Sequence, residues 1–458
     1  MNISGHLGQT DFYTELRAQR NLNSTVVFLN GDLVNNQESV SSGLSCRTFV
    51  NGEWGFASSS MAKTESIPKL IERAQTNAKF MADMKKDSGE TISLKNTNFN
   101  FEKDYRADGV AMDQKEIIEF TKNLSELASK KYSDLKSSQF IVSYNELEKN
   151  LVNSFGSKAF HILPRTVLYI VFSYEKDGEV VSLTKYLGEN GRPGDVLNDV
   201  DYIHGKMEEL YKEVVDKSNG IHASAGVKDV IISPSVTGVL AHEAIGHPAE
   251  ADLVKSGSVA GQYVNKKVGT DLVTMIDYAH TYNGKELPVP VYIDDEGVEA
   301  KDAVLIDKGV FKGFMNNREL AQHYGEAETG NARAFDYNDE PLIRMRNTII
   351  EPGESKLEDM ISSIDDGYYF TERSNGQADL TSEFMFGVVM GYEIKKGKLG
   401  RAIKDTTISG VAFDMLQTVD MVSDEFHVGT TGFCGKKQRM IVSHGGPSLK
   451  CKVHVGGR

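Results

Sequence analysis

The first half of the chain alternates between stretches with a helical period and runs with a strand pattern. Apolar residues three or four positions apart predict helices at 67–84, 112–132 and 196–215, and a short helix is expected at 11–17. β-Branched and aromatic runs predict strands at 25–29, 43–50, 53–57, 138–143, 150–156, 166–172 and 180–186. Asn51-Gly52 and Asp177-Gly178 predict tight hairpin turns between neighbouring strands.

The order of two strands and a hairpin occurs twice in this half, around residues 24–58 and 138–187. Each copy is followed by a helix that would cover one face of its strands. This order indicates a degenerate internal duplication of a strand-hairpin-helix unit. We therefore expect an N-terminal α/β domain that covers residues 1–220.

From residue 221 onward the chain is glycine-rich and dominated by strand patterns. Strands are predicted at 230–233, 287–293, 303–306, 309–315, 342–350, 368–371, 384–394, 409–413, 440–443 and 447–455, with one short helix at 357–364. Many short strands with glycine turns favour a barrel-like or sandwiched antiparallel arrangement. The fold class is thus predicted as α+β, with a C-terminal β-rich, barrel-like domain at 221–458 that carries the helix described next.

That helix follows the strand at 230–233 and carries the candidate chemistry. Ser233 can cap its N-terminus, and Pro234 suits the first turn, where no amide donor is needed. His242 and Glu243 lie on it, and His247 follows five positions after the first histidine. Two imidazoles beside a carboxylate are the parts of a hydrolytic metal site, namely two neutral ligands and a base.

The spacing of the two histidines differs from the four residues of His-Glu-x-x-His. Five residues at about 100° each place them roughly 140° apart on an ideal helix. Both can reach one metal only if the helix widens into a π-bulge or ends between them. Gly246 and Pro248 favour the second route, with His242 and Glu243 on the last regular turn and His247 at a bend. The alternative is an ordinary helix end with two polar histidines.

A catalytic metal needs about three protein ligands and an open position for water. Candidates for the third ligand are Glu250 just downstream, His280 in a polar loop and Cys434 near glycines. Zinc accepts oxygen, nitrogen and sulfur, so ligand chemistry leaves all three open. Lys436 and Lys437 would favour a thiolate at Cys434. The alternatives are a solvated carboxylate, an exposed loop histidine and a small residue in a turn.

Other polar clusters allow two interpretations each. Asp294 and Asp295, which precede a glutamate and a glycine, could bind a cation or form an acidic turn. Arg344 could hold a substrate carboxylate through its fork of donors, or form a structural ion pair. The segment 330–333 is expected in a loop near a site, with no assignable role.

Composition narrows the class of function. The 458 residues include 65 acidic and 51 basic ones, for a net charge of −14, which disfavours a nucleic-acid-binding surface. Three cysteines cannot form a complete set of disulfides, so a reducing compartment is expected. The first residues lack a signal-peptide pattern, and no apolar stretch approaches the length of a membrane span. We expect a cytoplasmic protein with neither nucleic acid nor membrane as partner.

Several of these motifs, in this order, resemble the TldD/PmbA family, whose members are also described as modulators of DNA gyrase. They are His242-Glu-Ala-Ile-Gly-His247, Ile293-Asp-Asp-Glu-Gly297, Arg344-Met-Arg-Asn-Thr348 and Phe433-Cys-Gly-Lys436, and the segment Gly43-Leu-Ser-Cys-Arg-Thr-Phe-Val-Asn-Gly52 resembles the opening domain of the family. The resemblance covers nearly the whole chain.

This resemblance implies a metallopeptidase with zinc or another divalent transition metal. Its pattern implies His242, His247 and Cys434 as metal ligands and Glu243 as general base. It also implies unfolded or leader-type peptides as substrates, hydrolysed by a water that the metal activates, and assembly as a homodimer or as a heterodimer with a paralogous subunit. The alternatives are a non-enzymatic regulator that binds a partner such as gyrase or a toxin, and a metallohydrolase of small amides.

Overall fold

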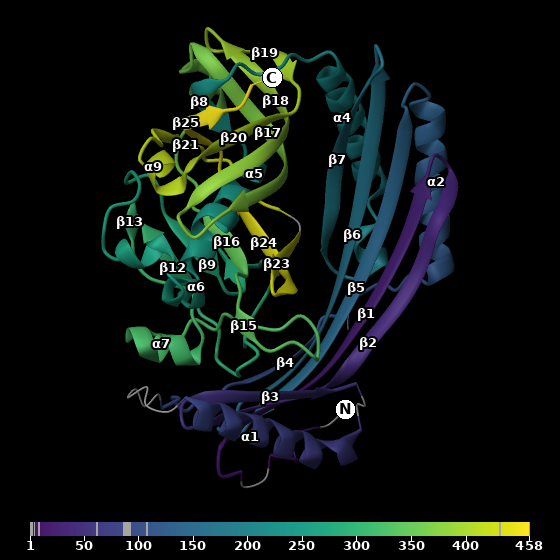
Figure 1. Cartoon of the computed structure of the whole chain (residues 1–458). Helices are drawn as coiled ribbons and strands as arrows, with labels where there is room; N and C mark the ends of the chain where they lie inside the picture. The colour runs from purple at the N-terminus through teal and green to yellow at the C-terminus, as the bar shows by residue number, and fades with distance from the viewer. Residues whose placement is uncertain are drawn as a thin grey trace.

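The computed structural model describes residue 3 and residues 5–7, 10–60, 63–85, 93–106, 109–429 and 432–457. A tall, curved sheet from the first half stands beside a β-rich body from the second half (Figure 1). The sheet contains β1 (Tyr13–Leu29), β2 (Asp32–Val50), β3 (Glu53–Ser59), β4 (Asn100–Asp104), β5 (Ser137–Asn153), β6 (Lys158–Lys176) and β7 (Glu179–Asn190). The helices of this half are α1 (Ile67–Met84), α2 (Gln114–Lys131), α3 (Pro193–Val196) and α4 (Val200–Ser218).

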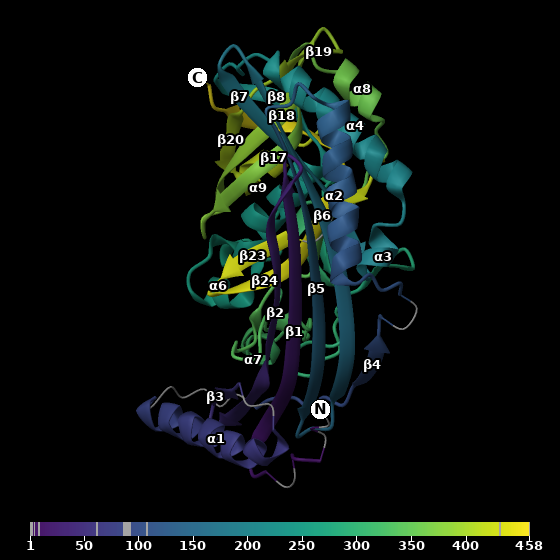
Figure 2. The same cartoon turned by 90° about the vertical axis from the view of Figure 1, so that its right-hand side faces the viewer.

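The sheet is built from two antiparallel meanders, in agreement with the predicted repeat. Its order is β3-β2-β1-β5-β6, with β7 and β4 both paired to β6. One meander, β1 to β3, leads into α1, which packs on β2 and β3 at the lower end (Figure 2). The other, β5 to β7, leads into α4. Helices α2 and α4 share a hydrophobic core with the upper part of the sheet.

In this half the predicted long helix and the predicted hairpin turn are confirmed, whereas the predicted strand lengths are not. The helix at 67–84 has the predicted bounds, and Asn51 and Gly52 both have positive φ in the hairpin turn. The predicted helix at 11–17 is wrong, because residues 13–29 form β1 and pair with both β2 and β5. Pairing on both sides outweighs the weak local preference of so short a segment.

The second half contains many short strands. They are β8 (Gly226–Ile232), β9 (Met275–Tyr278), β10 (Thr281–Tyr282), β11 (Lys285–Glu286), β12 (Ala303–Asp307), β13 (Val310–Phe311), β14 (Ala332–Arg333), β15 (Leu342–Ile343), β16 (Asn347–Ile350), β17 (Asp366–Ala378), β18 (Glu383–Lys395), β19 (Lys398–Ile403), β20 (Thr406–Val411), β21 (Met421–Val422), β22 (His427–Val428), β23 (Gly432–Lys436), β24 (Gln438–Gly446) and β25 (Leu449–Val455). The α-helices are α5 (Pro234–Val239), α6 (Ala251–Lys255), α7 (Arg318–Tyr324), α8 (Leu357–Ser362) and α9 (Ala412–Leu416).

Five of these strands close into the predicted barrel. Their order is β17-β8-β25-β20-β18, and β18 pairs back onto β17. A second sheet, β13-β12-β9-β16-β24-β22, carries β23 on β24. The strand predicted at 287–293 is wrong, because residues 287–291 are irregular. The amide of Val289 donates to the side chain of Asn347 and not to the backbone of a neighbouring strand.

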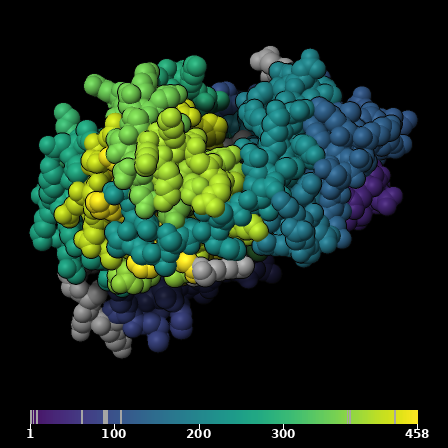
Figure 3. Space-filling model, turned by 90° about the horizontal axis from the view of Figure 1, so that it is seen from above, coloured from purple at the N-terminus to yellow at the C-terminus, as the bar shows by residue number. Residues whose placement is uncertain are grey.

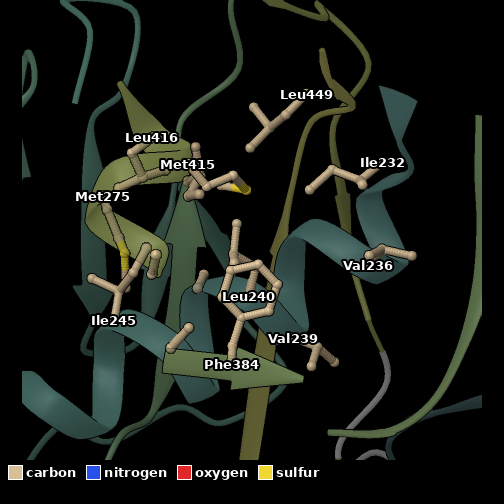
Figure 4. Packing of buried hydrophobic residues seen from close by; sticks show 14 of the residues in the cluster. Ile232, Val236, Val239, Leu240, Ile245, Met275, Phe384, Met415, Leu416 and Leu449 are labelled. Carbon is tan, nitrogen blue, oxygen red and sulfur yellow. The ribbon is translucent and has the colours of Figure 1, made fainter. Parts of the chain in front are cut away.

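The helix that carries the candidate site leaves the barrel directly after β8 and enters the core of the second half. Figure 4 shows Leu240 and Ile245 surrounded by apolar side chains that include Ile232, Met415 and Leu449. Leu240 and Ile245 are at most 1% exposed. This packing fixes the direction in which the polar side chains of the same helix point.

The two halves lie side by side, as the view from above shows (Figure 3), and buried ion pairs connect them. Asp295 accepts a hydrogen bond from Lys149 of β5 at 2.8 Å, and Glu296 pairs with Arg47 of β2. One carboxylate oxygen of Asp294 accepts hydrogen bonds from backbone amides of its own turn, and the other accepts from the amide of Ala332. The acidic turn at 294–297 therefore forms part of the contact between the two halves. None of the described helices has the length and apolar content of a membrane span.

Candidate metal centre

The backbone around the two histidines forms a π-helical segment, Leu240–Gly246. The amide of His247 donates to the carbonyl of His242, so the two residues are stacked on one face of the widened helix. His247 itself has α-region dihedrals, φ −59° and ψ −48°. The predicted bend at Gly246 and Pro248 is therefore wrong, and the other predicted route, widening by one residue, brings the histidines together.

Gly246 is needed for space and not for its dihedral freedom. Its φ is −63°, and a Cβ atom there would lie 2.3 Å from the sulfur of Met345. Met345 is fully buried. A side chain at position 246 would have to displace the side chain of Met345 or the π-helical segment itself.

Three side chains converge at the open face of this segment. One ligand atom from each of His242, His247 and Cys434 lies within 4.8 Å of the others, and in the described part of the chain these are the His, Cys, Asp or Glu groups that cluster in this way. His247 Nε2 is 3.0 Å from Cys434 Sγ. Cys434 comes from β23, and α5 packs on its neighbour β24. The structure thus brings together the three residues expected as ligands.

The environment of His242 fits a metal. Both ring nitrogens are buried and have no hydrogen-bond partner among the described residues. Burial, followed by the nearby His247 and His444, holds the pKa of His242 well below its usual value. A neutral imidazole with an unsatisfied nitrogen is the form that binds zinc, and the nitrogen–nitrogen–sulfur set is a common zinc donor set.

Glu250 forms a hydrogen bond with the ring of His247. Its Oε2 is 3.1 Å from His247 Nδ1, the ring nitrogen that faces away from Cys434, and it also accepts from Lys436 Nζ at 2.9 Å. Burial alone would lower the pKa of His247, but Glu250 and the Cys434 sulfur raise it to about 10. The same negative field would favour a cation in place of the proton.

Three expectations from the sequence change. Glu250 is not in the three-residue cluster and orients a ligand instead of being one. Lys436 directs its ammonium group to Glu250 and Asp252, so it acts on His247 through Glu250. His280 is also outside the cluster, because its ring stacks on Tyr292 at 4.2 Å.

Glu243 lies beside the cluster. Its Oε2 is 3.8 Å from His247 Nε2, and its side chain is 29% exposed, so solvent can reach it. Burial raises its pKa, although the nearby His247 and Arg373 oppose the shift. A raised carboxylate pKa suits a group that must both accept and release a proton near neutral pH.

The arginines of the 344–348 motif have structural partners. Arg344 is fully buried and donates to the carbonyls of Cys434 and Gln438, which fixes the hairpin that carries the thiol. Arg346 binds Asp277 at 2.8 Å. Arg344 therefore positions Cys434. Its terminal nitrogens bind backbone carbonyls and not the substrate carboxylate that the sequence also allowed.

Two further residues lie beside the cluster, and neither is marked by a recognisable motif in the sequence. The ring of His444 lies 5.9 Å from that of His242, and Arg373 lies 3.1 Å from His444 Nε2. Gly238 leaves room for His444, because a Cβ there would be 2.4 Å from its Nδ1. These residues come from β24 and β17, so only the closed barrel and the sheet beside it bring them to the site.

Comparison with known proteins agrees with the motifs. A sequence profile described as the PmbA/TldA metallopeptidase C-terminal domain matches residues 225–457, and one for domain 1 matches residues 14–78. A zinc metalloprotease TldD homolog of Saccharolobus solfataricus is 28% identical over 424 residues, which cover 91% of this chain and 90% of the relative. A metalloprotease of Methanocaldococcus jannaschii is 29% identical over 443 residues, which cover 96% of this chain and 95% of the relative.

Solved structures show the same fold. TldE from Thermococcus kodakarensis superposes with a TM-score of 0.74 at 20% identity and covers 97% of both chains. A protein described as a modulator of DNA gyrase from Thermotoga maritima gives a TM-score of 0.74 at 18% identity, covering 97% of this chain and 96% of that chain.

Proposed function

Since the chain belongs to the TldD/PmbA family of metallopeptidases, we propose that it is a zinc-type peptidase that cleaves unfolded or leader-type peptides. The observation that supports this most is the convergence of His242, His247 and Cys434 through the π-helical segment. Two imidazoles and one cysteine would supply three protein donors to a metal, the number that catalytic zinc sites use.

His242, His247 and Cys434 would hold the metal, with Glu250 fixing the ring of His247. A divalent metal held there supplies a Lewis acid that polarises a peptide carbonyl and lowers the pKa of a nearby water. Glu243 accepts the proton of the attacking water and passes it to the leaving amine. An extended peptide can be bound through its backbone as an added strand of the β-rich half, which tolerates many sequences.

The test compares two variants of the zinc-loaded protein. Glu243→Gln should abolish cleavage of an unfolded test protein while the zinc content stays at that of the parent, because Glu243 is not a ligand. Cys434→Ser should lose both activity and zinc. The control Glu358→Gln, on the exposed face of α8, should change neither. Cleavage by Glu243→Gln at the parent rate would show that another group is the base.

We also propose that the chain assembles as a homodimer or with a paralogous subunit, as the family resemblance implies. Light scattering after size exclusion, with and without a co-expressed paralogue, measures this directly. A monomer in both experiments would contradict the proposal.

A further inference from the structure

A cavity of about 70 Å³ lies between the curved sheet and the second half. One water needs only about 10–15 Å³ of such space, so a larger polar group fits. β5 and β6 contribute Lys149, His161 and Arg165 to its walls, and the second half contributes Asp295 and Arg333. Three of these residues, Lys149, Arg165 and Arg333, carry cationic side chains, although the chain as a whole is acidic.

Two of these cations have no ion-pair partner among the described residues. Arg165 is 5% exposed and donates from Nη2 to the carbonyl of Pro288, while its buried Nε has no partner in the same part of the chain. Arg333 donates from Nη1 to the carbonyl of Met345. Arg333 is partly buried. A buried charge such as that of Arg165 is costly without a counter-charge, and a bound anionic ligand would supply one.

The acidic groups of the cavity are already engaged, and among the described residues they form no ion pair with these arginines. Asp295 binds Lys149, the amide of Ala334 and, at 3.8 Å, Arg17. Burial lowers the pKa of Arg165 to about 10. Burial and then the nearby Arg344 lower the pKa of Arg333 to about 9, although Asp295 and Asp277 oppose the shift. Both guanidinium groups belong to residues that line the same cavity.

The cavity adjoins the metal centre. Met440 lines it and is the register partner of Cys434 in the β23–β24 hairpin. On the other side, Arg333 binds the backbone of Met345, whose side chain packs against Gly246 of the π-helical segment. The walls of the cavity are therefore connected to the metal centre through Met345 and Met440.

We propose that the cavity binds a carboxylate group of the peptide substrate, held between Arg165 and Arg333. The planar fork of a guanidinium group matches the two oxygens of a carboxylate. The carboxylate is either the C-terminal one of the peptide or that of an Asp or Glu side chain. This inference rests on the proposed function and adds to it a preference among peptides.

The experiment measures binding, so it does not depend on turnover. Zinc-loaded Glu243→Gln protein is titrated by fluorescence anisotropy with three labelled alanine-tyrosine hexapeptides: the free acid, the C-terminal amide, and the amide with one internal glutamate. Tighter binding of the free acid assigns the C-terminal carboxylate, and tighter binding of the glutamate peptide assigns a side chain. We expect a preference over the plain amide of about 10- to 100-fold, the worth of one or two charge-assisted hydrogen bonds. Equal affinities for all three peptides would overturn the inference.

Variants then locate the preference. Arg333→Gln and Arg165→Gln, each in the Glu243→Gln background, should bind the plain amide as before and lose the preference. Arg333→Lys, which keeps the charge without the fork, should retain only part of it. Arg401→Gln is the control, because Arg401 is an exposed residue paired with Glu393. A preference that survives both cavity substitutions would assign the arginines to the fold and refute the inference.

If the wild-type protein cleaves no peptide but the acid preference is present and lost in Arg333→Gln, the proposed hydrolysis fails while the carboxylate site stands. If cleavage is observed without a preference for acidic peptides, the carboxylate site fails while the proposed hydrolysis stands. The two proposals are thus separable.

Discussion

Substituting Glu250 by glutamine tests whether the carboxylate behind His247 controls metal binding. In the structure one oxygen of Glu250 serves both His247 Nδ1, at 3.1 Å, and Lys436 Nζ, at 2.9 Å, and Glu250 is fully buried. Glutamine keeps one acceptor oxygen but no charge, and its NH2 group would take the place of Oε1, which has no hydrogen-bond partner among the described residues. His247 thus loses a hydrogen bond to a charged acceptor, which is worth about 1.5–3 kcal/mol.

That loss corresponds to a dissociation constant for zinc raised by about 10- to 100-fold, the range typical of partners that orient metal ligands. Competition with a chelating zinc dye at constant pH measures it. Asp252→Asn is the matched control, because Asp252 also binds Lys436, at 2.8 Å, but has no contact with His247. If the control weakens zinc binding as much as Glu250→Gln, the charge of Lys436 matters and the orientation of His247 does not. An unchanged affinity in Glu250→Gln would refute the reasoning outright.

Three further predictions concern stability and are measured by thermal or denaturant unfolding. Gly246→Ala should destabilise the protein by about 1–3 kcal/mol, because its Cβ would lie 2.3 Å from the Met345 sulfur, and the double variant with Met345→Ala should cost less than the sum of the two single variants. Arg346→Met should cost about 3–5 kcal/mol by leaving the buried Asp277 unpaired, whereas the exposed Arg401→Met should cost less than about 1 kcal/mol. Burial, then Lys149, lowers the pKa of His161 from 6.5 to about 4, so the unfolded chain binds more protons between these values and stability falls as the pH drops through that window. Between pH 7 and pH 4, the free energy of unfolding of His161→Gln should therefore fall by about 1–3 kcal/mol less than that of the parent. Identical pH profiles would contradict the lowered pKa of His161.

The elements that the sequence predicts correctly depend on signals confined to the element itself. The apolar period of 67–84 and the positive-φ pair at Asn51 and Gly52 determine their structure without help from distant residues. The segments 138–143 and 150–156 are instead parts of one strand, β5. The polar residues between them resemble a turn, yet Lys149 is buried against Asp295 of the other half. A buried ion pair cannot be distinguished from a solvated turn in the sequence alone.

The candidate site shows the same limit. The spacing of His242 and His247 requires a distortion of the helix but does not choose between a bend and a π-helical turn. Gly246 and Pro248 favoured the bend because both disturb regular helices. The sulfur of Met345, about a hundred positions away, is what requires glycine at 246. Likewise, Arg165 and Arg333 meet only because the halves pack together, so neither had a recognisable role in the sequence.

The contacts between the halves bear on the boundary predicted near residue 220. Met390 and Ala402 of the second half belong to the hydrophobic core formed by α2, α4 and the long sheet, and they are 1% and 7% exposed. Unfolding either half would expose apolar surface of the other, at a cost of about 25 cal/mol per Å². The buried pair of Arg47 and Glu296 would also be broken. We therefore expect one cooperative transition in calorimetry of the metal-free protein. Two transitions, with the first unchanged by Met390→Ala, would show that the halves are independent units and that the shared core contributes little.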